Sequence, residues 1–204
     1  MNIVILGAAG RTGALLVEQA ITAGHTVTAF VRKEDTQTNA NAKTIIGDAT
    51  NEQDLEEAFK GQDAVISTLG PVKAGDKVVL TATVALIKAA KTQNVNRVIM
   101  MSSFLAADEF KPNPIVKFAL KLMAGIVSNY TSAEQLFSQS DLDYTIVFAT
   151  RLTNEPLNPH YRIVAETEKV GATDSISRAD VAEFLLTQLS DTTYIRKSVL
   201  ITNK

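Results

Sequence analysis

The sequence contains no cysteine and only two histidines, His25 and His160, among its 204 residues. Without thiols, the chain forms no disulfide and has neither a cysteine nucleophile nor a thiolate metal site. Two histidines are also too few to favour a histidine-based zinc site, so we expect no bound metal. Chemistry that depends on thiols or on zinc is therefore not expected.

The sequence also has little net charge and no long apolar run. Its formal net charge is −2, which gives no basic footprint for nucleic acid or for an anionic membrane surface. The most apolar stretch, Ile115 to Val127, is interrupted by lysines and is too short to span a bilayer. The first residues predict a strand rather than a signal peptide. We therefore expect a cytoplasmic protein, monomer or homodimer, whose partner is a small-molecule substrate rather than nucleic acid or membrane.

Short apolar runs alternate with helical patterns along the whole chain, which is typical of βαβ units and a parallel sheet. The runs are nearly continuous, as expected when helices cover both faces of the sheet. With 46% hydrophobic residues, a chain of 204 residues can build one domain with a sizeable core. We predict an α/β fold: a single Rossmann-type domain over residues 1–204, with a doubly wound, mostly parallel sheet flanked by helices on both faces.

The periodicity also places the individual elements. The predicted strands are Ile3–Leu6, Thr26–Val31, Thr44–Ile46, Ala64–Thr68, Arg97–Ser102, Tyr144–Phe148 and Ser198–Thr202. The predicted helices are Thr12–Ala23, Glu52–Phe59, Lys77–Gln93, Pro114–Gln139 with a potential break near Gly125, and Arg178–Leu189. Gly24 is placed to end the first helix, and Ser177 with Asp180 to cap the last. Prolines mark irregular regions near 104–114 and 150–163, where we expect the substrate because loops after parallel strands form the ligand crevice.

The most informative segment is Gly7–Gly13, where an apolar strand ends at one glycine and an amphipathic helix opens at another. In a dinucleotide site, Gly7 allows the tight turn and Gly10 leaves no side chain between the backbone and the pyrophosphate. Gly13 lets the helix pack close to the strand, and the N–H groups at the start of that helix face the phosphates. This context favours nucleotide binding over an ordinary strand–turn–helix.

The residues after the second strand favour NADP over NAD. NAD sites usually carry an acidic residue there for the ribose 2′-OH, but this strand is followed by Arg32. A guanidinium suits a 2′-phosphate through charge-assisted hydrogen bonds, and Arg11 would assist from the other side of the ribose. The alternative for Arg32 is an exposed charge at a strand end. We predict NADPH as the cofactor, with NAD less favoured.

Two later segments have both a cofactor role and a structural role open to them. Asp48 would accept from the adenine amino group, or it would form an Asx turn ahead of the next helix. Gly70 would permit close approach of the backbone to the cofactor, or it is an ordinary loop glycine. The complete set of predicted cofactor-binding residues is Gly7, Ala9, Gly10, Arg11, Thr12, Gly13, Arg32, Asp48, Ala49, Leu69, Gly70 and Ser102.

These motifs recur together in the atypical short-chain dehydrogenase/reductases, which the chain resembles over nearly its whole length. The resemblance is carried by Gly7–Gly13, Val31-Arg32, Gly47-Asp48, Met101-Ser102-Ser103, Tyr144–Val147 and Ser177–Ala182. Its nearest part is the short NAD(P)-binding, NmrA-like branch that includes biliverdin-IX-beta reductase, also known as flavin reductase. None of these motifs is specific for a substrate.

The chain departs from the family pattern at the catalytic dyad. Full-length dehydrogenases of this superfamily use a tyrosine with a lysine four residues later, and the lysine lowers the phenol pKa. Tyr130 is the candidate tyrosine, but residue 134 is Glu, which would raise a phenol pKa. Tyr130 is therefore either a site residue or a packing residue on a helix face, and the usual dyad is missing.

The missing dyad matches the flavin-reductase-like branch, in which hydride transfer needs little acid–base help because solvent can supply the proton. The resemblance aligns Ser103 with a serine near the nicotinamide, so Ser103 and Tyr130 are the predicted catalytic positions. Ser102 and Ser103 equally fit a role in satisfying the backbone at the strand end. Phe104 and Phe110 would wall an aromatic substrate or form satellite core.

Four further side chains are charged or titratable, and a binding role is considered for only one of them. Arg151 stands where many relatives have proline, and it would pair with a substrate carboxylate or with a neighbouring acidic residue. His160 is expected on the surface. Lys117 and Lys121 share a helix face and are expected on a solvated rim.

Two functions are compatible with these features. The first is an NADPH-dependent reductase that transfers hydride to a flavin-like, quinone-like or related small acceptor. The second is a non-catalytic NADP(H)-binding sensor or regulatory protein of the NmrA-like type. A nucleotide-sugar epimerase or dehydratase is disfavoured, because those enzymes need the dyad and a larger C-terminal substrate region.

Overall fold

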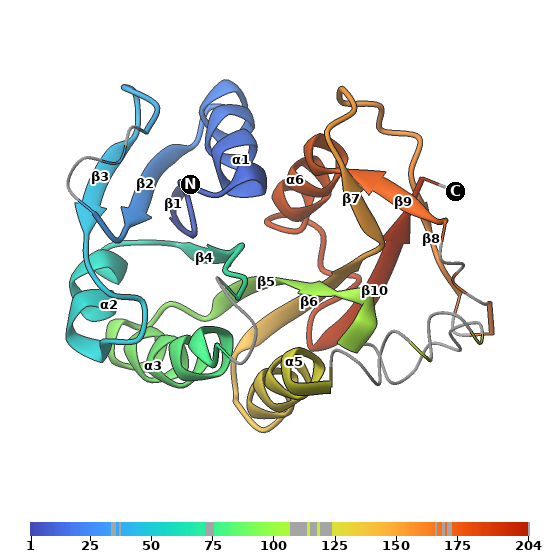
Figure 1. Cartoon of the computed structure of the whole chain (residues 1–204). Helices are drawn as coiled ribbons and strands as arrows, with labels where there is room; N and C mark the ends of the chain where they lie inside the picture. The colour runs from blue at the N-terminus through green and yellow to red at the C-terminus, as the bar shows by residue number, and fades with distance from the viewer. Residues whose placement is uncertain are drawn as a thin grey trace.

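An eight-stranded sheet forms the centre of the molecule (Figure 1), with strand order β3-β2-β1-β4-β5-β6-β10-β8. The computed structural model describes residues 1–33, 36, 38–71, 76–106, 114, 118, 124–165, 167, 168, 170 and 173–203, without the side chains of 124–126. The strands of this sheet are β1 (Asn2–Leu6), β2 (Thr26–Val31), β3 (Lys43–Ile46), β4 (Ala64–Ser67), β5 (Arg97–Ser103), β6 (Asp143–Ala149), β8 (Arg162–Ile163) and β10 (Lys197–Thr202). The first seven strands in the order are parallel, and β8 runs antiparallel at the edge. A second, two-stranded sheet pairs β7 (Arg151–Thr153) with β9 (Ser175–Ser177).

Helices cover both faces of the large sheet, as predicted for a doubly wound Rossmann-type fold. One face carries α1 (Arg11–Thr22) and α6 (Arg178–Thr187), and the other carries α2 (Glu52–Phe59), α3 (Val78–Gln93) and α5 (Ala124–Ser138) (Figure 1). A short 3₁₀ helix, η1 (Phe104–Ala106), follows β5. None of the helices in the described residues has the length and hydropathy needed to cross a bilayer.

Strand β1 shows how the sequence builds two cores at once. Because alternate side chains of a strand point to opposite faces, Ile3 and Ile5 pack toward α1 and α6, whereas Val4 and Leu6 pack toward α2, α3 and α5. All four side chains are fully buried. A continuous apolar run is therefore the sequence signature of a strand covered on both faces.

The ends of α1 and α6 follow from local sequence. Gly24, at φ +83°, terminates α1, with His25 N–H donating to Ala20 O and Gly24 N–H to Ile21 O, which is a Schellman motif. Ser177 caps α6 by accepting from Asp180 N at 2.9 Å. Both predicted helix ends are confirmed.

The predicted and observed elements agree within two residues at every end for the seven predicted strands and for the helices corresponding to α1, α2, α3 and α6. The helix predicted over Pro114–Gln139 is observed as α5 from Ala124, and most of its earlier part lies outside the described residues. The prediction that 150–163 is irregular is wrong in part, because β7 and β8 lie within it. Strands of two or three residues carry no usable periodicity, and they form only because β9 and β10 are brought beside them.

Candidate functional site

A crevice follows the carboxyl ends of the parallel strands, where the strand order reverses between β1 and β4. It comprises two cavities. The β2–β3 cavity, of about 580 Å³, is bordered by the ends of those strands, and the β5–β6 cavity, of about 750 Å³, lies over the ends of β5 and β6. The two cavities share Gly10, Thr68, Leu69 and Gly70, so they form one continuous site.

The glycine turn between β1 and α1 stands at the junction of the two cavities. Gly7 has φ +78°, and its carbonyl accepts from Gly10 N at 2.8 Å, which closes the turn. A Cβ on Gly13 would lie 2.1 Å from Gly7 O, and one on Gly10 would lie 3.0 Å from the same atom. The predicted mechanical roles of Gly7 and Gly13 are therefore confirmed. The bare backbone at Gly10, ahead of the free N–H groups of α1, fits a pyrophosphate.

The β2–β3 cavity gathers most of the residues predicted to bind the adenosine half of a dinucleotide. Its lining includes Gly7, Ala9, Arg32, Asp48 and Ala49. Arg32 is exposed at the end of β2 and electrostatically influences Asp48. This cavity therefore combines a guanidinium and a carboxylate.

Asp48 forms the Asx turn that was one of its two alternatives. Its Oδ1 accepts from Thr50 N at 2.9 Å and from Thr50 Oγ1 at 2.8 Å. These bonds, with a smaller contribution from Arg32, hold the pKa of the Asp48 carboxyl below its usual value. The contact with an adenine amino group stays a prediction.

Gly47 has a role that the sequence pattern did not reveal. A Cβ at this position would lie 2.8 Å from Cζ of Phe30 and 3.0 Å from Cβ of Asp54. Gly47 thus makes room for the Phe30 ring, which lines the β2–β3 cavity. The turn after β3 is selected by the packing of a side chain on β2.

The end of β4 borders both cavities. Thr68 Oγ1 donates to Leu6 O at 3.1 Å, which ties the end of β4 to the end of β1. A Cβ on Gly70 would be in ordinary contact, at 3.5 Å, with the Tyr130 hydroxyl. Leu69 and Gly70 therefore lie at the junction of the two cavities, and the close approach of the Gly70 backbone to a cofactor stays a prediction.

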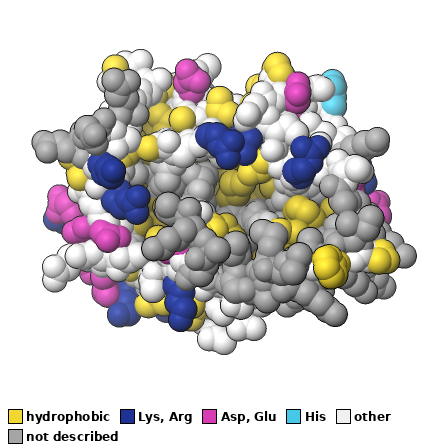
Figure 2. All heavy atoms as spheres, in the orientation of Figure 1, with side chains coloured by type: hydrophobic (Ala, Val, Ile, Leu, Met, Phe, Trp, Pro, Cys, Tyr) yellow, Lys and Arg dark blue, Asp and Glu magenta, His cyan; other side chains and the backbone are white. Residues whose placement is uncertain are grey.

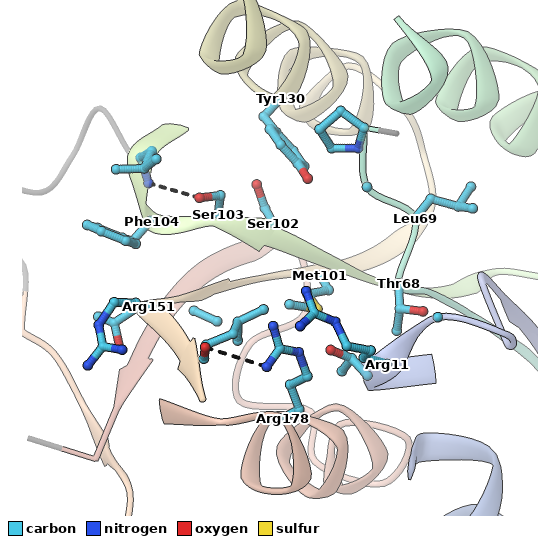
Figure 3. A pocket seen from close by; sticks show the side chains of 18 residues that line it. Arg11, Thr68, Leu69, Met101, Ser102, Ser103, Phe104, Tyr130, Arg151 and Arg178 are labelled. Atoms are coloured by element: carbon cyan, nitrogen blue, oxygen red, sulfur yellow. Dashed lines mark hydrogen bonds between the residues drawn. The ribbon is translucent and has the colours of Figure 1, made fainter. Parts of the chain in front are cut away.

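Two serines at the end of β5 line the β5–β6 cavity and differ in their hydrogen bonds (Figure 3). Ser102 is buried, and its Oγ donates to Glu134 Oε1 at 2.8 Å. Ser103 Oγ accepts from Leu105 N at 3.4 Å, which is the local backbone contact that was one of its alternatives. Sequence reasoning treated Glu134 only as a substitute for a lysine, and it missed the hydrogen bond to Ser102.

Tyr130 reaches the same cavity from α5, with its hydroxyl directed inward (Figure 3). It is 8% exposed, so it is both a packing residue and a lining residue. Burial, and secondarily the negative charge of Glu134, raises the pKa of Tyr130 to about 12. The phenol is therefore protonated at neutral pH and acts as a hydrogen-bond donor rather than as a base.

Three arginines line the opposite side of the β5–β6 cavity: Arg11 from α1, Arg151 from β7 and Arg178 from α6 (Figure 3). Arg11 does not face Arg32 across one ribose as predicted. It lines this cavity while Arg32 lines the other, and its side chain reaches into the β5–β6 cavity beside that of Arg178 (Figure 3). Arg151 makes no ion pair with an acidic side chain within the described part of the chain.

Arg178 is a charged lining residue that sequence reasoning missed. It is the first residue of α6 and is 8% exposed, with Nη1 donating to Asn154 Oδ1 at 2.7 Å and to Thr153 O at 3.0 Å. A cation at a helix N-terminus opposes the helix dipole, so Arg11 and Arg178 at the starts of two helices were a usable signal. Figure 2 shows Lys and Arg side chains gathered around a hollow in which hydrophobic side chains are visible.

The remaining residues named from the sequence line the cavity, lie on the surface or fall outside the described residues. Thr12 lines the β5–β6 cavity, and Phe104 forms part of its apolar wall. His160 is exposed, as expected. Phe110, Lys117 and Lys121 lie outside the described residues.

Comparisons with known proteins agree with this geometry. A family model described as NAD(P)H-binding matches residues 7–192. An uncharacterised chloroplastic protein of Arabidopsis thaliana is 32% identical over 197 residues, covering 89% of this chain and 69% of that protein. The structure of the oxidoreductase YlbE from Lactococcus lactis is similar with a TM-score of 0.85 and 26% identity, covering 100% of this chain and 91% of that one. A short-chain dehydrogenase/reductase from Veillonella parvula in complex with NADP has a TM-score of 0.78 and 25% identity, covering 98% of this chain and 93% of that one.

Proposed function

We propose that this chain, which belongs to the NAD(P)H-binding family and is an atypical short-chain dehydrogenase/reductase, is an NADPH-dependent reductase of a flavin-like, quinone-like or related small acceptor. The observation that carries the proposal is the pair of cavities that meet at the glycine turn. When bound, NADPH supplies a hydride. The β2–β3 cavity would hold its adenosine half, and the β5–β6 cavity leaves room beside the other half for an acceptor.

Arg32 supports the choice of NADPH over NADH. Its exposed guanidinium lies at the end of β2, the position from which Rossmann sites read the adenosine ribose. A guanidinium binds a 2′-phosphate through paired, charge-assisted hydrogen bonds. The short-chain dehydrogenase/reductase from Veillonella parvula, which was solved with NADP, supports the same choice.

Residues of the β5–β6 cavity would orient the acceptor and exclude water from it. Met101, Phe104 and Leu152 supply apolar lining, and polar atoms enter from Ser102, Ser103 and Tyr130. An acceptor held between such walls reacts at an orientation set by the protein, which is the main contribution needed where no dyad acts.

Two hydroxyl groups are placed to interact with polar atoms of the acceptor. Tyr130 keeps its proton at neutral pH because its pKa is about 12. The Ser102 hydroxyl donates its proton to Glu134 Oε1 at 2.8 Å, so its oxygen lone pairs are the part that can face the acceptor, where they would accept a hydrogen bond from an N–H or O–H group. The proton that the reduced acceptor takes up would come from solvent, as in a hydride transfer that needs little acid–base help from the protein.

The proposal is tested by two independent measurements. Binding of NADPH is followed by its fluorescence, and turnover is followed as NADPH oxidation with FMN, riboflavin, menadione and benzoquinone. We expect binding, together with oxidation accelerated by at least one acceptor. Tyr130→Phe, which removes a hydroxyl from the cavity lining, should slow turnover without weakening NADPH binding, whereas Ser138→Ala, on the exposed face of α5, should change neither. NADPH binding with no acceleration by any acceptor would contradict the reductase and favour a cofactor sensor.

A further inference from the structure

Three arginines line the β5–β6 cavity, and among the lining residues that the structure describes none is acidic. Arg11, Arg151 and Arg178 reach it from three separate elements, and Figure 3 shows them on the side of β5 away from Tyr130. The β2–β3 cavity differs, because two aspartates accompany its basic residues. Within the described part of its lining, the larger cavity thus has a positive charge that no carboxylate balances.

Arg178 is a buried cation whose charge is energetically unfavourable in the absence of a bound anion. The side chain is 8% exposed, and the acceptors of its hydrogen bonds are the neutral oxygens of Leu152, Thr153 and Asn154. Within the described residues no carboxylate pairs with it, and burial, followed by the positive charge of Arg11, lowers its pKa. A buried cation without a counter-ion is unfavourable, and a bound anion would remove that cost.

The hydrogen bonds of Arg178 also leave part of its donor set available. All of its bonds within the described residues are made by Nη1. These bonds fix the guanidinium against β7, with Nη2 and Nε as further donors. A planar guanidinium fixed in this way is suited to a carboxylate or phosphate, whose oxygens it binds in pairs.

The positions of the three arginines indicate two different anionic ligands, the phosphates of the cofactor and an anionic group of a second molecule. Arg11 directly follows Gly10, which borders both cavities, so it belongs with the phosphates of the cofactor. Arg151 and Arg178 come from β7 and α6, and they line the larger cavity and not the smaller one. These two side chains are therefore placed for a ligand other than the adenosine half of the cofactor.

We infer that Arg151 and Arg178 bind an anionic group of the hydride acceptor, a carboxylate or a phosphate, and so select acidic acceptors over neutral ones. The inference rests on the proposed function, since it names the class of acceptor for the same site. The ring of the acceptor would lie against Met101 and Phe104, with its anionic group toward the two arginines. Arg151 is exposed at the cavity rim and Arg178 is buried within, so the anion would be held between rim and interior.

Three flavins with the same ring system test this directly. Riboflavin is neutral, FMN carries a phosphate, and a carboxymethyl flavin carries a carboxylate. Binding of each is measured by flavin fluorescence with and without NADP, and NADPH oxidation is measured in parallel. We expect at least one anionic flavin to bind about tenfold or more tightly than riboflavin, and the stronger of the two identifies the preferred group.

Substitutions at Arg151 and Arg178 test whether these two side chains cause the preference for anionic flavins. Arg151→Ala and Arg178→Gln should remove most of the preference for the anionic flavin and leave riboflavin binding unchanged. Arg162→Ala should keep the preference, because Arg162 is an exposed arginine that lines neither cavity. Should Arg178→Gln fail to fold, as judged by circular dichroism, Arg151→Ala and the loss of the preference at high salt in the unmodified protein carry the test.

Each outcome separates this inference from the proposed function. Equal binding of all three flavins would overturn the inference, and NADPH oxidation with those flavins would still support the reductase. A preference for anionic flavins without NADPH oxidation would support the anion site and contradict the reductase. Weaker binding of NADP in Arg178→Gln, with the flavin preference intact, would assign Arg178 to the cofactor and overturn the inference.

Discussion

The two halves of the crevice are built and charged differently. The β2–β3 cavity is formed by strand ends, turns and the start of α3 within the first 81 residues, and its basic side chains are accompanied by aspartates. The β5–β6 cavity combines residues from Gly10 to Arg178, and no carboxylate accompanies its arginines among the lining residues that the structure describes. The comparison separates a cofactor half, assembled from local motifs, from an acceptor half, where charge and distant residues set the selectivity.

The largest loss of stability and of cofactor binding should come from Gly13→Ala, which places a side chain at the junction of the two halves. A Cβ here would lie 2.1 Å from Gly7 O, a backbone atom that cannot rotate away. We expect a loss of stability of roughly 1–3 kcal/mol or more, together with loss of NADPH binding. Thermal unfolding and NADPH fluorescence measure the two effects.

Gly70→Ala is the matched control for that substitution. Its Cβ would make an ordinary 3.5 Å contact with the Tyr130 hydroxyl. We expect a change in stability of about 0.5 kcal/mol or less. Equal destabilisation by the two substitutions would show that the close approach at Gly13 does not hold the turn.

Arg32→Ala tests whether the cofactor half reads a 2′-phosphate. Losing a charge-assisted contact should cost roughly 1.5–3 kcal/mol, about tenfold or more in affinity, for NADPH and nothing for NADH. Affinities of both cofactors are measured by fluorescence titration. Lys33→Ala is the control, because Lys33 is the next exposed cation and lines neither cavity. The same loss for both cofactors would contradict phosphate recognition.

Tyr130→Phe tests the acceptor half through its pH dependence. The pKa of Tyr130 is about 12 in the folded protein, against an ordinary tyrosine pKa of 10.0. The folded state therefore retains this proton at a pH where the unfolded chain releases it, so the stabilisation is complete below about pH 10 and is lost as pH rises toward about 12.

The expected difference is roughly 2 kcal/mol of unfolding free energy across that interval, from the size of the pKa shift. It is measured by urea unfolding at a series of alkaline pH values in the parent protein and in Tyr130→Phe. The parent should lose more stability than the variant as pH rises. Parallel curves would show that Tyr130 is not held protonated by its surroundings.

The smallest effect is expected at Asp48, in the cofactor half. Asp48→Asn keeps an Oδ1 that accepts from Thr50 N, so stability should change by less than about 0.5 kcal/mol. Asp48→Ala removes the Asx turn and should cost roughly 1 kcal/mol. Chemical denaturation of both variants gives the comparison. Equal losses would show that the negative charge, rather than the turn, is what stabilises this position.

The cofactor half was predictable because its signals are local. A glycine that must adopt positive φ, a second that must clear a carbonyl and a cation at a strand end all lie within short, periodic segments. The same reasoning placed Asp48 in an Asx turn as one of two alternatives, and the structure has that turn. It did not place Arg11 in the β5–β6 cavity, because the cavity that this side chain lines is completed by residues of β5, β7 and α6, far along the chain.

The acceptor half was only partly predictable. The sequence predicted Ser102, Ser103 and Tyr130 as separate site residues. The hydrogen bond between Ser102 and Glu134 also requires α5 to pack at one particular position along the axis of β5. No feature of the local sequence sets that position. It results from the packing of α5 side chains such as Phe137 into the core.

By itself, the sequence determined the doubly wound fold, the glycine turn and the cationic end of β2, because each depends on backbone conformation and hydrophobic period within a few residues. The tertiary structure alone decided that one cavity is lined by Arg11, Arg151 and Arg178, which are spread over most of the chain, with no carboxylate beside them in the described lining. Charge balance in a cavity depends on which distant elements converge there, and that convergence is produced by packing on the faces of the sheet.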